Sequence, residues 1–82
     1  MRNQSLAGLP LFKEAYIKEL FLDGSIRRRL QDLGFVPNAA VTPLYRSPFG
    51  DPTAYQILET VIALRHEDAE KILVSEKQSE VF

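Results

Sequence analysis

The stretch of residues 25–35, SIRRRLQDLGF, constrains the fold most, because it predicts a short helix with two defined ends. Ser25 is a good N-cap residue, since its hydroxyl can accept a hydrogen bond from a backbone N–H of the first turn. Ile26, Leu30 and Leu33 follow at helical spacing and form an apolar side. We therefore expect one helix of about two and a half turns that packs this side against the core.

Gly34 and Phe35 predict how this helix ends. Glycine is favoured just beyond a helix, where the backbone takes a left-handed conformation. The residue that follows often packs back against the last turn, and Phe35 can do so against Leu30. Leu30, Leu33, Gly34 and Phe35 are therefore expected to have structural roles. In the turn that comes next, Asn38 can take a positive φ.

The rest of the chain predicts mainly β structure. Apolar alternation and β-branched residues favour strands in five segments, namely 12–22, 39–46, 53–58, 61–65 and 73–74. We expect a bulge near Glu19, where the alternation is irregular, and a bulge or a sheet edge at Pro43, which lacks an N–H.

Three further segments complete the expected order of elements. Residues 59–60 are expected to form a hairpin turn between two of the strands. A second short helix is expected to begin at His66, with acidic residues in its first turn. Residues 1–11 are expected to be irregular, because Gly8 and Pro10 interrupt them.

The length of 82 residues corresponds to one small domain. Short strands with little helix in so short a chain favour a closed or nearly closed β-barrel. The barrel core is expected to span residues 5–75, and residues 76–82 are expected to form a flexible tail.

Composition excludes several classes of protein. The net charge is −1, whereas nucleic-acid-binding domains are usually strongly basic. The chain has no cysteine, which rules out disulfides and thiolate-based metal sites. No apolar run approaches the roughly 18 residues of a membrane span, and the first residues do not form a secretory signal. A cytoplasmic location is therefore expected.

Arg27, Arg28 and Arg29 lie in the first turn of the predicted helix, where the helix dipole disfavours cations. The simplest interpretation is a solvated helix side, since exposed charges rarely need a partner. A second interpretation is contact with an acidic protein surface, which suits the planar guanidinium. Nucleic-acid binding is the third and is not favoured, because no stacking aromatic residues accompany the arginines.

His66 and Glu70 stand one helical turn apart and are weak candidates for a metal site. Iron and zinc sites usually need three or four converging ligands, and the chain has no second histidine. We therefore expect a surface or capping role for His66 and no metal or cofactor.

Gly50, Asp51 and Pro52 are expected to form a rigid structural loop. Pro52 restricts the backbone of Asp51 to extended geometry, and Asp51 is expected to accept backbone hydrogen bonds. Nothing in the sequence pairs Asp51 with a base or a nucleophile, so an enzyme is not expected. Phe49 and Tyr45, near this loop, are expected to cap the end of the barrel, with an aromatic peptide groove as the alternative.

Together these segments resemble the FeoA family, which accompanies the ferrous iron permease FeoB. The matching segments are residues 5–7 (SLA), 28–37 (RRLQDLGFVP), 48–52 (PFGDP), 64–65 (LR) and 69–72 (AEKI). The resemblance implies a mainly β, SH3-like barrel with one short helix after the first strand and another before the last. It also implies a non-enzymatic accessory or regulatory protein of ferrous iron uptake that contacts the cytosolic domain of FeoB, and the membrane only through that permease.

Two kinds of surface are expected to bind the partner. One is the arginine helix, and the other is a strip of apolar residues expected to point outward from the 53–65 hairpin, which could also mediate self-association. The strip consists of Ala54, Leu58, Val61 and Ala63. Alternative functions are a small nucleic-acid-binding barrel and a repressor-type regulatory domain, since the FeoA module also occurs at the C-terminus of some metal-dependent repressors.

Overall fold

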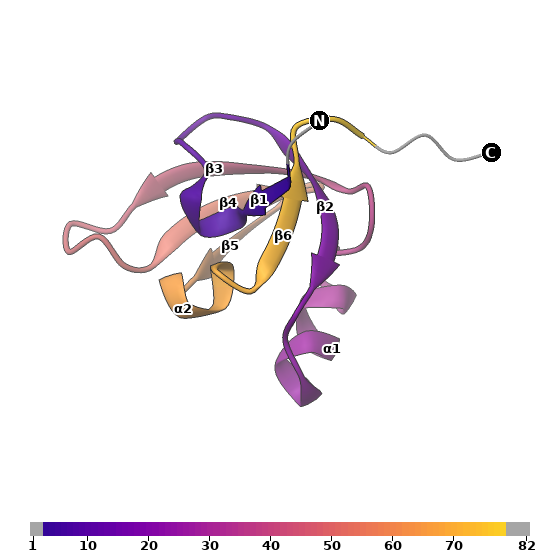
Figure 1. Cartoon of the computed structure of the whole chain (residues 1–82). Helices are drawn as coiled ribbons and strands as arrows, with labels where there is room; N and C mark the ends of the chain where they lie inside the picture. Colours follow the sequence, from indigo (N-terminus) through magenta and orange to yellow (C-terminus); the bar gives the residue numbers. More distant parts are fainter. Residues whose placement is uncertain (1–2, 79–82) are drawn as a thin grey trace.

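The computed structural model describes residues 3–78, which form an antiparallel β-sheet with two short α-helices (Figure 1). The elements are β1 (Asn3–Ser5), a 3₁₀ turn (Leu6–Gly8), β2 (Ala15–Leu20), α1 (Gly24–Asp32), β3 (Ala40–Arg46), β4 (Thr53–Ile57), β5 (Thr60–Leu64), α2 (His66–Ala69) and β6 (Ile72–Ser75). This composition confirms the prediction of a mainly β fold with two short helices.

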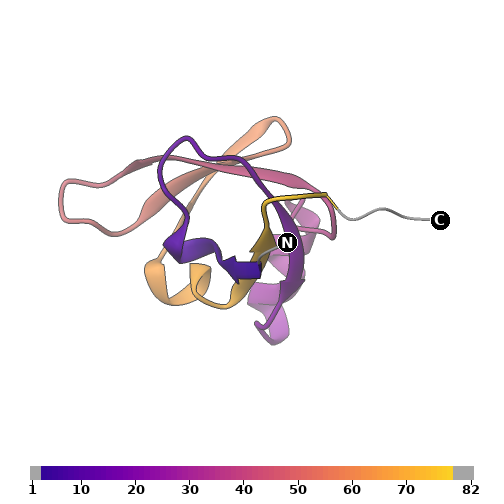
Figure 2. The same ribbon diagram turned by 45° about the horizontal axis from the view of Figure 1, so that its top comes forward.

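The six strands form one sheet in the order β1-β6-β2-β3-β4-β5. Every neighbouring pair is antiparallel, and the sheet curves around the core (Figures 1 and 2). The last strand, β6, therefore lies between β1 and β2, near the start of the chain. None of the described helices is long and apolar enough to cross a membrane.

Strand β1 corrects the prediction that residues 1–11 are irregular. Asn3, Gln4 and Ser5 pair with β6, opposite Ser75, Val74 and Leu73. These three polar side chains give no pattern that marks a strand, because the backbone partner supplied by β6 decides their conformation.

Both predicted irregularities of the sheet are present. The register between β2 and β6 shifts between Ile17 and Glu19, which confirms the bulge. The register between β3 and β4 shifts between Pro43 and Tyr45. Because β3 lies inside the sheet, Pro43 is accommodated by this shift rather than by a sheet edge.

Helix α1 ends as the sequence predicts. The N–H of Phe35 donates to the carbonyl of Leu30 over 3.0 Å, and that of Gly34 to Gln31 over 3.1 Å. Gly34 has a φ of +115°, and this pair of bonds defines a Schellman motif. Phe35 and Leu30 both belong to the buried core, so the end of the helix is fixed by packing as well as by hydrogen bonds.

The start of α1 differs from the prediction. The helix begins at Gly24, after Asp23, so Ser25 lies inside its first turn rather than at the N-cap. Gly24 has a φ of +63°, which a side chain at that position would disfavour. The glycine therefore lets the chain turn into the helix two residues earlier than an N-cap at Ser25 would, which places Arg29 in the last turn of α1 instead of the first.

The β4–β5 turn also differs, by one residue. Ile57 pairs with Thr60, so the turn consists of Leu58 and Glu59 and not of residues 59–60. Leu58 has a φ of +54°, an uncommon conformation for a bulky residue. No glycine or asparagine marks such a turn in the sequence, which explains the error.

The expected outward strip of the hairpin is only partly correct. Leu58, Val61 and Ala63 are exposed, but Ala54 is buried. Ala54 lies in the inner strand β4, opposite Tyr45 of β3 and Ala63 of β5, and a neighbouring strand on each side leaves so short a side chain little access to solvent. Ala54 is therefore not part of an exposed contact surface.

One hydrophobic core fills the inside of the sheet. Its buried members come from the 3₁₀ turn, all of the strands β2 to β6, both α-helices and the segments next to them. The largest of the fully buried side chains are Phe35, Leu6, Leu9, Ile17, Leu30, Ile57 and Ile72. A small sheet thus closes around a core that Phe35 enters from the helix.

The expected tail begins with ordered contacts. The N–H of Lys77 donates to the hydroxyl of Ser75, and the side-chain amide of Gln78 donates to the carbonyl of Asn38. The remainder of that predicted tail, 79–82, lies outside the described residues.

Phe35 and Phe49 offer a matched test of the core. Phe35 is fully buried and Phe49 is 95% exposed. Phe35→Ala should lower the free energy of unfolding by about 3–5 kcal/mol, because it leaves a cavity. Phe49→Ala should change it by less than about 0.5 kcal/mol. Urea titrations of both variants measure this, and equal losses would contradict the assigned core.

Tyr55 makes a prediction about pH. Burial, chiefly, raises the pKa of its hydroxyl above the ordinary value of 10.0. A raised pKa in the folded state means that the neutral form stabilises the fold, and that this stability is lost as the pH rises through the raised pKa. Between about pH 9 and pH 11, Tyr55→Phe should therefore lose less stability than the wild type, as measured by urea titration. Equal losses would show that Tyr55 does not contribute.

Candidate functional site

His66 is the first residue of α2 and Glu70 is its C-cap, with 3.3 Å between Nε2 of the histidine and Oε2 of the glutamate. Both side chains are largely exposed. Within residues 3–78, no three or more histidine or acidic side chains converge as a metal site would require. The pair is arranged as a surface contact between adjacent turns of a helix.

Asp51 does accept a backbone hydrogen bond, as predicted, but the donor is outside its loop. Oδ1 of Asp51 accepts from the N–H of His66 over 2.8 Å, at the first residue of α2. A carboxylate is favourable there, because the first N–H groups of a helix have no partner within the helix. Asp51 therefore fixes the start of α2 from the β3–β4 loop.

Ser47 holds the β3–β4 loop together. Its hydroxyl donates to the carbonyl of Asp51 over 2.7 Å and accepts from the N–H of Asp51 over 3.1 Å. The N–H of Gly50, which has a φ of +87°, donates to the carbonyl of Ser47. This braced loop extends away from the rest of the sheet (Figures 1 and 2).

Pro52 takes part in the same loop through its backbone rather than by packing. Its carbonyl accepts a hydrogen bond from the N–H of Ser47 over 3.0 Å, where the loop joins β3 to β4. The ring of Pro52 is only half-buried and does not belong to the hydrophobic core. The peptide bond between Asp51 and Pro52 is cis, a feature that the sequence analysis did not predict.

The prediction that Phe49 and Tyr45 cap the barrel is wrong. Phe49 is 95% exposed at the tip of the loop, and Tyr45 is 60% exposed. The core is filled by residues from other elements, so neither ring is needed to close it.

Arg27 differs from the two arginines that follow it. Its Nη1 donates to the carbonyl of Leu20 over 2.7 Å and lies 3.5 Å from that of Leu22. These bonds tie α1 to the end of β2. They also account for a cation near the helix N-terminus, where the dipole disfavours it, because each carbonyl gains a charged donor.

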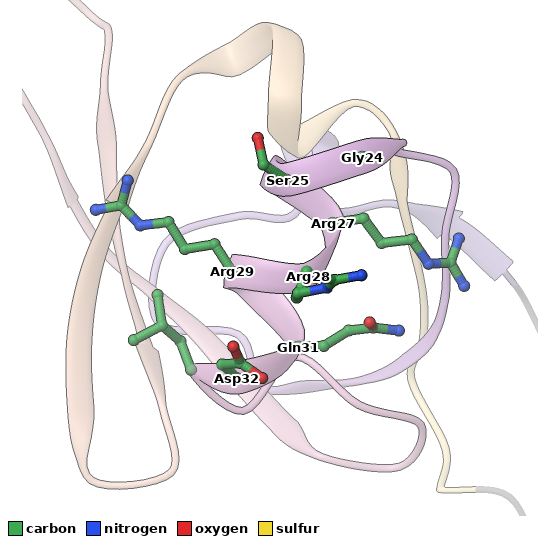
Figure 3. A pocket seen from close by; sticks show the side chains of 8 residues that line it. Gly24, Ser25, Arg27, Arg28, Arg29, Gln31 and Asp32 are labelled. Atoms are coloured by element: carbon green, nitrogen blue, oxygen red, sulfur yellow. The ribbon is translucent and has the colours of Figure 1, made fainter.

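Arg28 and Arg29 are exposed. Figure 3 shows that Arg27 and Arg29 point to opposite sides of α1, with Arg28 between them. An open pocket over this helix is lined by Gly24, Ser25, Arg27, Arg28, Arg29, Gln31, Asp32 and Leu33. Two guanidinium groups are thus presented to the outside by a helix whose ends are both fixed.

Leu58 connects the β4–β5 turn to the end of α1. A Cβ atom on Gly34 would lie only 2.7 Å from Cδ1 of Leu58, so the leucine packs directly over the glycine. Leu58 nevertheless remains 62% exposed, and Val61 is 54% exposed. We call Arg28, Arg29, Leu58 and Val61 the helix–turn surface.

The helix–turn surface combines exposed cations of α1 with exposed apolar side chains of the β4–β5 hairpin, whose turn packs over Gly34 at the end of the helix. Such a combination suits protein binding, in which apolar contact provides affinity and charges provide orientation. Of the residues predicted to bind a partner, Arg28, Arg29, Leu58 and Val61 are exposed, and the turn that carries Leu58 packs over the end of α1. The structure uses Arg27 within the fold and buries Ala54.

The contacts that the sequence analysis missed lack local signals. The bond between Asp51 and the start of α2 joins positions 15 apart, and Arg27 reaches back seven positions to Leu20. Gly34 was expected to end the helix, but its contact with the side chain of Leu58 depends on a turn that the sequence does not mark.

The chain matches one protein family. The model of the FeoA domain matches residues 4–76. Among curated proteins, the Fe(2+) transport protein A/Fe(2+) transporter FeoB fusion protein of Porphyromonas gingivalis is 39% identical over 51 residues. That match covers 62% of this chain but only 6% of the fusion protein.

Two solved structures of FeoA proteins have a similar fold. The FeoA protein from Chlorobium tepidum is 30% identical with a TM-score of 0.84, over 88% of this chain and 69% of that one. The zinc complex of Stenotrophomonas maltophilia FeoA is 32% identical with a TM-score of 0.77, over 88% of this chain and 89% of that one. The latter is described as a prokaryotic SH3 domain protein, so the prediction of an SH3-like fold is confirmed.

Arg27 and Arg28 should differ in their effect on stability. Arg27→Ala removes the donor to the Leu20 carbonyl and should lower the free energy of unfolding by about 1–2 kcal/mol. Arg28→Ala should change it by less than about 0.5 kcal/mol, because this side chain is exposed. Urea titration distinguishes the two, and equal effects would contradict the structural role of Arg27.

Proposed function

The chain belongs to the FeoA family, and on that premise we propose that it is an accessory or regulatory protein of ferrous iron uptake that binds the cytosolic domain of a FeoB-like permease. The Porphyromonas gingivalis relative supports this partner, because it joins transport protein A and FeoB in one chain. Domains fused in one protein act at a high effective concentration of one another, which favours a functional contact. In a separate chain, the same contact has to be made by a binding surface.

The helix–turn surface is the proposed contact. The packing of Leu58 over Gly34 is the observation that carries this choice, since it joins the exposed apolar turn to the arginine helix. Arginine is suited to acidic partner surfaces because its guanidinium can donate two parallel hydrogen bonds to one carboxylate. Arg28 and Arg29 would orient the complex, while Leu58 and Val61 would be buried in it.

The position of α1 makes this contact possible without a change in the fold. Its C-terminal end is held by the Phe35 and Gly34 hydrogen bonds, and Arg27 holds its first turns to the end of β2. A contact surface on fixed elements loses less conformational entropy on binding than one on a loop. The proposed role is therefore that of a preformed adaptor, without catalysis of its own, acting at the cytoplasmic side of the permease.

The Stenotrophomonas protein has been put forward as a ferrous iron transport activating factor. By analogy, the complex with the permease would change transport rather than carry iron itself. The His66–Glu70 pair offers two exposed ligands, fewer than iron or zinc sites in proteins usually have.

The test is binding of this chain to the cytosolic domain of the FeoB-like permease from the same organism, measured by isothermal titration calorimetry. Arg28→Glu should weaken binding at least about tenfold, because it reverses a charge at the contact. Leu58→Asn should do the same by removing the apolar side chain, and asparagine tolerates the positive φ of this position.

Arg46→Glu is the matched control, since Arg46 is exposed at the end of β3 and outside the helix–turn surface. It should leave the affinity unchanged. Absence of binding by the wild type would contradict the proposed partner. Binding that neither Arg28→Glu nor Leu58→Asn weakens would instead contradict the proposed surface.

A further inference from the structure

Strand β5 (Thr60–Leu64) is an edge of the sheet. The strand order places β1 and β5 at its two ends, and within the described residues β5 pairs with β4 alone. The outer side of an edge strand presents backbone N–H and C=O groups to any strand that comes alongside.

β5 lacks the features that usually keep an edge strand from pairing. Natural edges carry charged residues, proline or bulges, or are very short. The sequence of β5, TVIAL, has no charge and no proline, and its pairing with β4 runs without a shift from Ile57–Thr60 to Thr53–Leu64. The other edge, β1, has only three residues, all polar. β5 is therefore the edge better suited to pairing.

The register of the β4–β5 hairpin decides which backbone groups of β5 lie on the side without a partner strand. In a two-residue hairpin, the residues that flank the turn, here Ile57 and Thr60, form a hydrogen-bonded pair, and bonded and non-bonded pairs then alternate. The backbone N–H and C=O groups that point toward β4 are consequently those of Thr60, Ile62 and Leu64. The N–H and C=O groups of Val61 and Ala63 are left at the free edge, and both side chains are exposed.

Opposite charges stand at the two ends of this edge. Glu59 precedes β5 and Arg65 follows it, and both are exposed. In an antiparallel pair of two β5 strands centred on Ile62, Glu59 of each copy lies opposite Arg65 of the other. The same register places Val61 opposite Ala63 of the second copy, so the free backbone groups meet.

Other registers lose this match. Centring the pair on Val61 places Glu59 opposite Ala63, and centring it on Ala63 places Arg65 opposite Val61. Only the register centred on Ile62 both aligns the free backbone groups and sets an unlike charge opposite each charged residue.

We propose that this chain forms a two-fold symmetric dimer by antiparallel pairing of β5 with β5 of a second copy, with Glu59–Arg65 ion pairs at both ends. Two strands related by a two-fold axis make the same contacts twice, as a closed dimer requires. The paired segment is short, so the dimer dissociates on dilution. This inference goes beyond the proposed permease contact and does not depend on it.

The experiment is sedimentation velocity of the full chain alone over a series of concentrations at low salt. The wild type should show a concentration-dependent dimer. Glu59→Arg and Arg65→Glu should each raise the dissociation constant at least about tenfold, because each places like charges opposite one another at both ends. An equimolar mixture of the two variants should dimerise again, since both ion pairs re-form between unlike chains.

Two further variants complete the test. Val61→Pro removes a free-edge N–H while leaving the β4 ladder intact, and should also raise the dissociation constant. Glu19→Arg makes the same charge change as Glu59→Arg on β2, three strands away, and should have no effect. Circular dichroism verifies that each variant is folded.

The proposal is overturned if the wild type remains monomeric at every concentration. A dimer that is insensitive to both single charge reversals also overturns it, as does a mixture of the two variants that stays monomeric. No permease is present in this experiment, so its failure is distinct from failure of the permease contact.

Discussion

The end of α1 at Gly34 and Phe35 is the constraint on which the rest of the structure depends. Phe35 is fully buried and is among the largest side chains of the core, so it anchors the helix to the sheet. Gly34 must take a left-handed conformation for Phe35 to turn inward, and its lack of a side chain leaves room for Leu58. Gly34 therefore ends the helix, lets Phe35 enter the core and leaves space for Leu58 of the hairpin turn.

The three adjacent arginines illustrate how a uniform run of sequence divides into different roles. Arg27 satisfies a backbone carbonyl at the end of β2, whereas Arg28 and Arg29 extend outward. The unfavourable helix dipole at this end is offset for Arg27 by bonds inside the fold. Arg29 lies in the last turn of α1 and not, as predicted, in the first, so the helix dipole favours its charge. Arg28 has no such local reason among the bonds of α1, and an acidic partner would provide one.

The sequence predicts features whose causes are local and misses those whose causes are distant. The helix end, the bulge near Glu19 and the positive φ of Asn38 follow from the nature of the residues themselves. The burial of Ala54 depends on neighbours in two other strands, and β1 exists because β6 pairs with it. The exposed arginines and two of the exposed apolar residues of the helix–turn surface follow from the sequence, but the packing of Leu58 over Gly34 depends on the position of the hairpin turn.

The β4–β5 hairpin takes part in both proposed contacts. Val61 belongs to the helix–turn surface through its side chain and to the free edge of β5 through its backbone. A permease bound over the turn and a second copy paired along β5 would therefore approach the same residue from adjacent directions. If the two contacts interfere, linkage requires that dimerisation weaken permease binding by the same factor as permease binding weakens dimerisation. Because the dimer responds to concentration by mass action, the amount of this protein would then set how much of it is free to bind the permease.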